Sequence, residues 1–467
     1  MRLRSWMLAA ALLPVGTSAA WALDSTAADR SDVAVTIYND NLGLVRELRR
    51  VTVPAGNGSL RFMDVASAIR PETVSVGVRD GGPVTVLEQN YEYDLLSPDK
   101  LLEKYVGQAL TVYVKNEKTG DESPVQATLL SLNQGPIYQI GDQISLGLPG
   151  RVVVPRLPEN LIARPTLVWL LGAERGGPRN LEVRYLTGSM GWRADYVATL
   201  AEDDHAMDLT GWVTIDNRSG AAYEDATVKL VAGDVHQVRR GAPSPMPRMM
   251  AMKAAADESF SQRELFEYHL YELGRRTTLK DNQTKQIQLL AAERVPVEKR
   301  YVAEYAFSPY GAPGGPSKPE SVAVKLEFVN DKPSRLGQAL PKGTVRVYKR
   351  DADGSAIFAG EDAIDHTPEG ERVRLEIGDA FDVRTERKFT AWRDLSKEEV
   401  EATVSVTVRN TKSEPVMVQV RERFPRERDL VSSSVEALEP DALTLEFRVD
   451  VRAKSTREIT YRVRARR

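Results

Sequence analysis

The residues best suited to binding a metal ion are four methionines in one short stretch of the chain. Met246, Met249, Met250 and Met252 lie within seven residues, although the 467-residue chain holds only ten methionines. Thioether sulfur is a soft ligand that selects Cu(I), and a flexible segment can fold around a single ion. The pattern predicts a candidate Cu(I) site. A methionine-rich linker and an adaptable apolar contact for a partner are the alternative interpretations.

Three short motifs contain the residue types of a serine acyl-enzyme, but their order and spacing do not fit one. Residues 97–100 match S-x-x-K, residues 118–120 match K-T-G and residues 131–133 match S-x-N. In penicillin-binding enzymes the K-T-G element follows S-x-N, and the domain is far larger than this spacing allows. We therefore interpret Ser97 as a helix N-cap and residues 118–120 as a turn.

The other reactive residue types form no recognisable catalytic or metal-binding set. His205, His236, His269 and His366 are widely scattered, and no two have ligand spacing along one element. The chain contains no cysteine, which excludes disulfides, thiolate ligands and a thiol nucleophile. We accordingly predict no catalytic residue and no cofactor. The 66 acidic residues leave open a hydrolase that uses a pair of carboxylates.

The N-terminus has the features of a cleavable secretory signal. Two arginines precede an apolar run over residues 6–15, which is shorter than the roughly 20 residues needed to span a bilayer. Residues 20–22 (Ala-Trp-Ala) fit a small-x-small cleavage site, so we expect removal of residues 1–22, with cleavage after Ala22. No later apolar run reaches spanning length. The sequence thus predicts a periplasmic or secreted protein without a transmembrane segment.

The charge balance argues against a nucleic-acid partner. The chain has 63 Lys and Arg against 66 Asp and Glu, a formal net charge of −3. Nucleic-acid binding usually requires a basic excess or a basic stripe, because contacts to phosphate supply much of the affinity. The expected partner is therefore an envelope protein or a glycan.

Apolar and polar residues alternate with a period of two along most of the chain, which predicts an all-β protein. Residues 97–107 are the exception, because a Ser N-cap, a Pro at the first helical position and a final Gly predict one short helix. The Pro- and Met-rich segment 239–262 is expected to form a mobile loop, and residues 308–319 a linker. Short, regularly spaced strands in the later part of the chain are typical of immunoglobulin-like β-sandwiches.

The length and the two breaks suggest several domains behind the signal peptide. We expect an N-terminal β-rich domain with one short helix over residues 30–200. The expected remainder is a β-sandwich domain over 201–310, a β-rich domain over 320–395 and C-terminal immunoglobulin-like strands over 400–467.

Several short strand and turn segments, densest after residue 181, carry a family resemblance. They are residues 209–220 (LTGWVTIDNRSG), 223–226, 230–233, 266–271, 281–285, 340–348, 360–362, 366–368 and 378–383. These segments resemble the bacterial family called domain of unknown function 4139. The family includes mucoidy-inhibitor-like exported proteins, so the resemblance implies a role in the envelope or in control of exopolysaccharide. This chain is without their coiled-coil insertion, and the family has no established catalytic residues to transfer.

Taken together, the sequence predicts an exported, non-enzymatic β-sandwich protein of the cell envelope that binds or scaffolds a protein or glycan partner. A cell-wall or polysaccharide hydrolase is one alternative, which a cleft with paired carboxylates would favour. A periplasmic Cu(I)-binding protein that uses the four methionines is the other.

Overall fold

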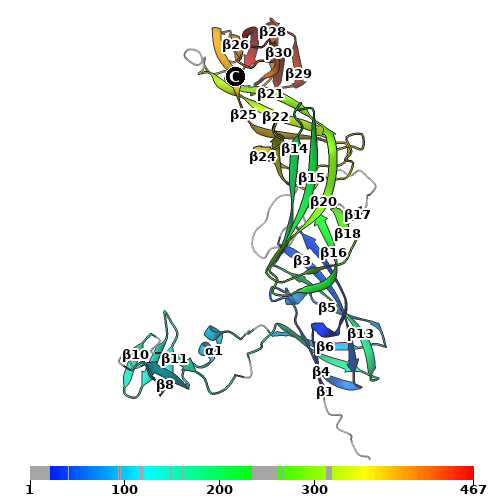
Figure 1. Ribbon diagram of the computed structural model, residues 1–467, viewed down its shortest axis with the longest axis vertical. Coiled ribbons are helices and arrows are strands. Elements are labelled where there is room, and N and C mark those ends of the chain that lie inside the picture. Colours follow the sequence, from blue (N-terminus) through cyan, green and yellow to red (C-terminus); the bar gives the residue numbers. More distant parts are fainter. Residues whose placement is uncertain are drawn as a thin grey trace, which may run out of the picture.

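The chain forms an elongated series of β-sheets (Figure 1). The computed structural model describes residues 21–39, 41–92, 94, 96–115, 119–147, 150–158, 161–233, 260–265, 268–311 and 318–467. In these residues the regular elements other than strands are one α-helix, α1 (Pro98–Lys104), and two short 3-10 helices, η1 (Ala27–Asp29) and η2 (Pro71–Thr73). The predicted all-β fold is therefore confirmed.

Two sheets near the N-terminal end share one core. The smaller sheet has the order β1 (Trp21–Ser25), β4 (Gly56–Met63), β12 (Thr166–Ala173) and β6 (Thr85–Glu92). The larger sheet has the order β17 (Phe260–Leu265), β18 (Tyr268–Leu273), β16 (Tyr223–Ala232), β2 (Arg30–Tyr38), β3 (Leu42–Val53), β13 (Gly177–Thr187) and β5 (Ser75–Asp80), with β19 (Thr277–Leu279) beside β16. Phe62 and Trp169 of the smaller sheet belong to the same buried cluster as Val45 and Tyr185 of the larger one.

A small unit projects from this body, on the left of Figure 1. Its antiparallel sheet has the order β10 (Gln143–Leu146), β9 (Ile137–Ile140), β8 (Glu122–Ser131), β7 (Ala109–Lys115) and β11 (Arg151–Val153). It has a separate core that includes Tyr105, Leu110 and Tyr138. Ser97 caps α1 by accepting the backbone N–H of Lys100 at 3.2 Å, as its sequence context predicts.

Two further sheets continue the body toward the C-terminus. The middle sheet has the order β20 (Gln283–Pro296), β15 (Ala206–Asn217), β14 (Met190–Leu200), β23 (Gly343–Arg350) and β24 (Ala356–Ile364). The last sheet has the order β28 (Arg428–Ser433), β31 (Ser455–Arg466), β26 (Glu399–Asn410), β25 (Arg372–Asp394), β22 (Glu320–Val329), β21 (Glu298–Ala306), β27 (Val416–Arg423), β30 (Thr444–Val451) and β29 (Ala437–Asp441). It encloses its own cluster of valine and aromatic side chains, such as Val404, Phe447 and Tyr461.

The sheets cut across the segments expected from the sequence. β14 and β15 pair from Met190↔Asn217 to Leu200↔Met207, although the expected division after residue 200 separates them. The strands after residue 400 share one sheet with β21, β22 and β25. The expected divisions differ from the observed sheets because strands far apart in the sequence pair with one another. A local sequence pattern does not predict such pairing.

The expected loop and the expected signal peptide each lie partly outside the described residues. The expected loop covers residues 239–262, of which residues 239–259 lie outside the described residues. Residues 260–262 belong to β17, so the prediction of a loop is wrong for these three residues. Residues 1–20 of the expected signal are likewise outside, whereas its last two residues, Trp21 and Ala22, form the start of β1.

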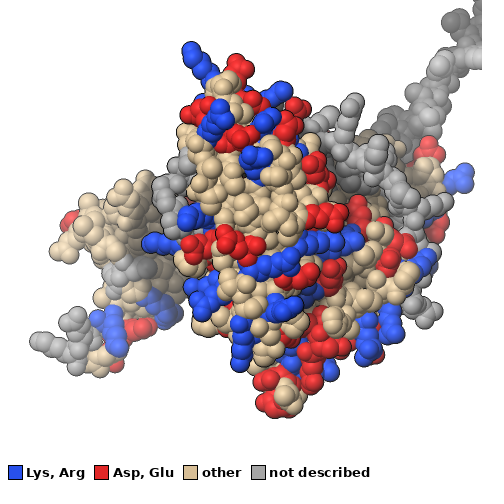
Figure 2. Space-filling view, turned by 90° about the horizontal axis from the view of Figure 1, so that it is seen from above, with Lys and Arg blue, Asp and Glu red and all other residues tan. Residues whose placement is uncertain are grey.

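The surface carries charges of both signs. Seen from the C-terminal end, Lys and Arg are interspersed with Asp and Glu over the body (Figure 2). Within the described ranges, no helix combines the length and the apolar character that crossing a membrane requires.

Candidate functional site

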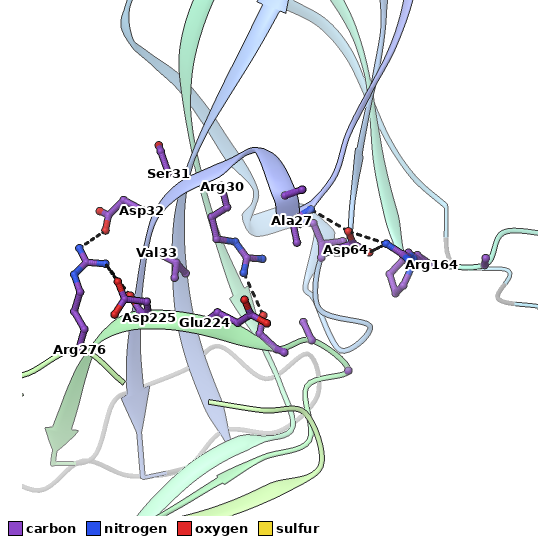
Figure 3. A pocket seen from close by; sticks show the side chains of 17 residues that line it. Ala27, Arg30, Ser31, Asp32, Val33, Asp64, Arg164, Glu224, Asp225 and Arg276 are labelled. Carbon is purple, nitrogen blue, oxygen red and sulfur yellow. Dashed lines mark hydrogen bonds and ion pairs between the residues drawn. The ribbon is translucent and has the colours of Figure 1, made fainter. Parts of the chain in front are cut away.

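A polar pocket lies beside the start of β2, where five segments of the chain converge (Figure 3). Its volume is about 700 Å³. The walls are η1 with the first residues of β2, the turn with Asp64 after β4, residues 163–165 before β12, residues 220–225 at the start of β16, and Arg276 before β19. We call this the β2 pocket. Because it gathers distant segments, folding of both N-terminal sheets is required to form it.

Local hydrogen bonds fix the wall formed by η1. Thr26 and Asp29 form a capping box, in which the Thr26 hydroxyl accepts the Ala28 N–H at 3.3 Å and the Asp29 carboxylate accepts the Thr26 N–H at 2.8 Å. The Asp64 carboxylate accepts the Ala27 N–H at 3.0 Å, which ties η1 to the end of β4. The wall therefore has a defined position before any ligand binds.

The opposite wall depends on one glycine. Gly220 has a φ of 82°, and a Cβ added there would lie 1.9 Å from the Ser67 hydroxyl oxygen. Only glycine combines this conformation with so close an approach. Gly220 thus lets the segment that precedes β16 reach the pocket.

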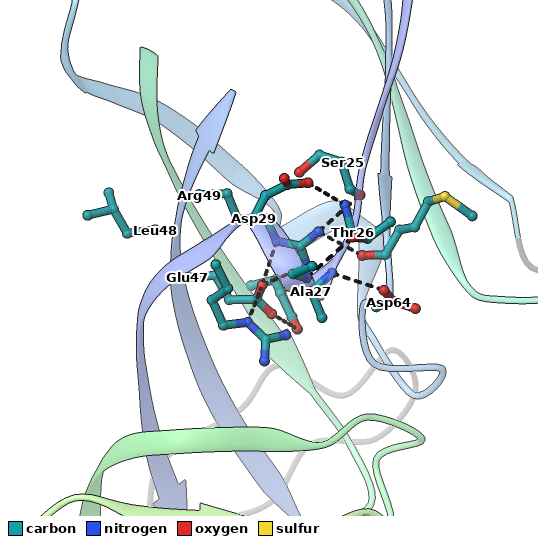
Figure 4. A network of polar contacts seen from close by, with 12 residues as sticks. Ser25, Thr26, Ala27, Asp29, Glu47, Leu48, Arg49 and Asp64 are labelled. Carbon is teal, nitrogen blue, oxygen red and sulfur yellow. Dashed lines mark hydrogen bonds and ion pairs between the residues drawn. The ribbon is translucent and has the colours of Figure 1, made fainter. Parts of the chain in front are cut away.

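Beneath the pocket lies a buried charge network centred on Glu47 (Figure 4). In β3 the inward positions alternate with outward ones, and Glu47 and Arg49 occupy two successive inward positions between Val45 and Val51. Glu47 Oε2 accepts hydrogen bonds from Arg49 Nη2 at 2.7 Å and from Arg30 Nε at 3.1 Å. Both β3 side chains are 0% exposed, so this network is part of the core.

The two guanidinium groups of the network have further partners. Arg49 Nη1 donates to the carbonyls of Met63 at 2.8 Å and Ser25 at 3.1 Å, and its guanidinium carbon lies 3.5 Å from the centre of the Phe62 ring. Arg30 Nη1 donates to the carbonyl of Ala222 at 3.2 Å. These bonds join β1, β4 and the loop before β16 to β2 and β3, so the network sets the positions of the pocket walls.

Tyr185 completes the network by donating its hydroxyl to Glu47 Oε1 at 3.1 Å. Burial raises the pKa of the Tyr185 phenol well above its ordinary value, and the charge of Glu47 adds to the effect. Burial likewise raises the pKa of the neighbouring Tyr223 to about 12. Both phenols therefore remain neutral near pH 7 and act as hydrogen-bonding groups rather than as bases.

Ion pairs line the mouth of the β2 pocket. Arg276 Nη2 lies 2.5 Å from Asp32 Oδ1, and Arg276 Nη1 lies 3.7 Å from Asp225 Oδ2. Arg164 pairs with Asp64 at 2.9 Å. Partial burial raises the pKa of Asp32, but hydrogen bonds from Arg276 and Arg46 outweigh it, and the net pKa is lowered. Asp32 is therefore ionised at neutral pH and holds the arginine in place.

The side chains that line the pocket supply charged and hydrogen-bonding groups. Its ionisable lining residues are arginines, aspartates and one glutamate, and the Ser31 hydroxyl donates to the Leu48 carbonyl at 3.1 Å. Arg30 Nη2 has no hydrogen-bond partner among the described residues, but this atom is buried and the side chain is only 8% exposed. Glu224 is exposed at the mouth, with no ion pair in the described part of the chain. A ligand that enters the pocket can therefore meet the Glu224 carboxylate.

The residues singled out in the sequence do not assemble in this pocket. Met246, Met249, Met250 and Met252, the candidate Cu(I) ligands, lie outside the described residues, as does His236. His205 lies in the turn between β14 and β15, His269 in β18 and His366 beyond β24, where its Nδ1 accepts the Lys342 N–H at 3.1 Å. The described residues contain no group of three or more His, Asp or Glu placed to hold a metal ion.

Sequence reasoning missed Arg30, Glu47 and Arg49. The available signal was two charged residues at inward positions of an alternating strand, since a buried charge requires a partner. Their partner Arg30 lies on the neighbouring strand, and Tyr185 is 138 positions away from Glu47. Charged residues at two inward positions of one strand could have predicted a buried ion pair, but not the pocket above it.

Comparison with known proteins assigns the chain to a family. A family model described as Domain of unknown function (DUF4139) matches residues 181–466, from β13 to the end of β31. The match covers more than half of the chain, and the protein therefore belongs to this family. No curated protein matches the chain. The β2 pocket combines residues inside the match, such as Arg276, with β2 and β3, which precede it.

Proposed function

We propose that this protein is exported and acts as a non-enzymatic binding or scaffolding protein of the cell envelope, and that it holds a protein partner at the β2 pocket. The observation that carries the proposal is the fixed array of charges in the pocket. Arg30 is held from below by Glu47, while Asp32 and Asp225 hold Arg276 at the mouth. Because these side chains are already positioned, binding a partner costs little conformational entropy for ordering them.

The lining favours a polypeptide over a neutral glycan. Charges of both signs lie around the pocket, and they complement a segment that carries both acidic and basic side chains. No aromatic side chain lines the pocket, so a sugar ring finds no flat apolar surface on which to stack. The exposed Glu224 carboxylate suits a basic side chain or a backbone N–H of such a segment.

The experiment compares charge variants of the mature protein in capture from detergent-solubilised envelope. Arg276→Glu and Glu224→Lys each reverse one charge at the pocket mouth, where both residues are exposed enough to tolerate the change. Lys332→Glu is the matched control, because its side chain is 66% exposed and lies away from the pocket. We expect both pocket variants to retain less than a tenth of the captured partner, and the control to retain at least half. Equal capture by all variants would contradict the proposal.

The two alternatives receive less support from the described residues. A hydrolase of the glycosidase type needs one carboxylic acid that stays protonated, and Asp32 cannot supply it because its pKa is lowered. The Cu(I) alternative rests on the four methionines alone, and it requires its own test.

A further inference from the structure

A second pocket lies in the C-terminal sheet, where β25, β26 and β31 run side by side. It has a volume of about 720 Å³. β25 and β26 lie nearer the C-terminal end of the body, apart from β3 and β16 (Figure 1). The side chains that decide its chemistry are Arg384, Arg409, Lys454, Glu386, Thr407 and Thr456. We call it the C-terminal pocket.

The strand register places two arginines directly opposite each other. Arg384 of β25 pairs with Arg409 of β26, and Arg409 pairs in turn with Thr456 of β31. Both arginines are exposed, and they belong to the same face of the sheet because directly paired residues point to the same side. Like charges in this position repel one another and destabilise a sheet unless something neutralises them.

Nothing in the described part of the chain neutralises this pair. Arg384, Arg409 and Lys454 have no carboxylate within 4.0 Å among the described residues. Other cations of the same sheet do find acids, such as Arg387 with Glu422 at 2.6 Å and Arg464 with Glu401 at 2.8 Å. At the pocket, by contrast, two cations without an acidic partner face each other directly across neighbouring strands.

The lining as a whole is positive. Three cations against the single carboxylate of Glu386 give 3 − 1 = +2, whereas the whole chain has a net charge of −3. The hydroxyl groups of Thr456, which faces Arg409 on β31, and of Thr407, two residues before Arg409 in β26, add neutral donors. Guanidinium groups and hydroxyls together bind carboxylate and phosphate oxygens, with geometry that suits paired oxygens.

A buried asparagine holds the pocket in shape. Asn410 is 1% exposed, and its Nδ2 donates to the carbonyls of Glu414 at 2.8 Å and Arg452 at 3.1 Å. The Lys454 N–H also donates to the Lys412 carbonyl at 3.0 Å. These bonds connect the two loops that end β26 and begin β31, so the cation of Lys454 is carried by an anchored turn beside the two arginines.

We propose that the C-terminal pocket is a binding site for an oxyanion group, a carboxylate or a phosphate, of an anionic ligand. The oxyanion neutralises the Arg384–Arg409 pair and takes hydrogen bonds from the surrounding hydroxyls. This site is independent of the β2 pocket and of the partner proposed there.

The test measures binding of inorganic phosphate and of citrate to the full mature chain by calorimetry, at constant ionic strength set with chloride. The variant is Arg384→Gln/Arg409→Gln. The control is Arg393→Gln/Arg462→Gln, which removes the same charge from exposed positions of β25 and β31 outside the pocket. We expect the native chain and the control to bind, and the variant to bind at least tenfold more weakly. Stronger binding of phosphate or of citrate identifies which oxyanion the site prefers.

A thermal readout separates loss of the site from loss of the fold. Without added anion, the C-terminal sheet of the variant should unfold at a temperature equal to or above that of the native chain, because the repulsion has been removed. The bound anion should raise the temperature of this transition in the native chain and the control, but not in the variant. No binding of either anion by the native chain, or equal binding by variant and control, would overturn the proposal.

Discussion

Replacing Glu47 by glutamine should destabilise the core beneath the β2 pocket. The substitution preserves shape but removes the only carboxylate among the described residues that pairs with Arg49, which is 0% exposed, and with Arg30, which is 8% exposed. Breaking a buried ion pair from one side costs about 3–5 kcal/mol, because the remaining charges are buried without compensation. The amide oxygen of glutamine can still accept one hydrogen bond, so we expect a value near the lower end, about 3 kcal/mol.

Amide hydrogen exchange of β2 and β3 is the suitable assay. The chain contains three separate buried clusters, so unfolding of the whole protein is not a single transition. Exchange of individual amides reports the local opening free energy instead. A loss of about 3 kcal/mol accelerates exchange through opening by roughly 100-fold.

Glu182→Gln on β13 is the matched control. Glu182 also faces three arginines, Arg46, Arg79 and Arg184, but their side chains are 31%, 55% and 55% exposed. Water can solvate these arginines after the change, so the expected cost is about 1 kcal/mol or less. If Glu47→Gln changed the opening free energy by no more than Glu182→Gln, the reasoning about burial would be refuted.

Three further predictions concern other parts of the chain. Burial raises the pKa of Asp204, but hydrogen bonds from Lys299 and Lys349 lower it below 3.8 overall, so this carboxylate stabilises the fold above about pH 4 and the contribution is lost as the pH falls further. Asp204→Asn should therefore cost about 1–2 kcal/mol at pH 7 and flatten the acid limb of a stability–pH curve, and an unchanged acid limb would contradict this assignment. Ser97→Ala should destabilise the projecting unit by about 1 kcal/mol in denaturant unfolding, without altering capture of an envelope partner, since it removes the cap of α1. Replacing the four methionines by leucine should abolish Cu(I) binding measured by chelator competition if the copper alternative holds, and unchanged affinity would end that alternative.

Patterns local to the sequence predict the elements well. Period-two alternation indicates the strands, because one face of each strand meets a core. The Ser97 cap and the following proline place α1, although the helix ends at Lys104 rather than at residue 107.

Arrangements between distant segments could not be predicted in the same way. β2 pairs in parallel with β16, from Ala34↔Thr227 to Tyr38↔Val231, and β14 pairs in parallel with β23. A local sequence pattern does not indicate such pairings, and the expected division after residue 200 therefore did not take them into account. The β2 pocket depends on the same long-range pairing, and neither its walls nor the role of Glu47 could be derived from one strand.

The most direct test of the proposed function is site-specific photocrosslinking in cells that produce the protein. A photoreactive phenylalanine replaces Ala28, which is exposed and lines the β2 pocket, and the same residue replaces Lys332 in a control. We predict that the Ala28 position forms a covalent adduct with an envelope protein after irradiation, and that Arg276→Glu abolishes this adduct. No adduct at Ala28, or the same adduct at Lys332, would contradict a protein partner at this pocket.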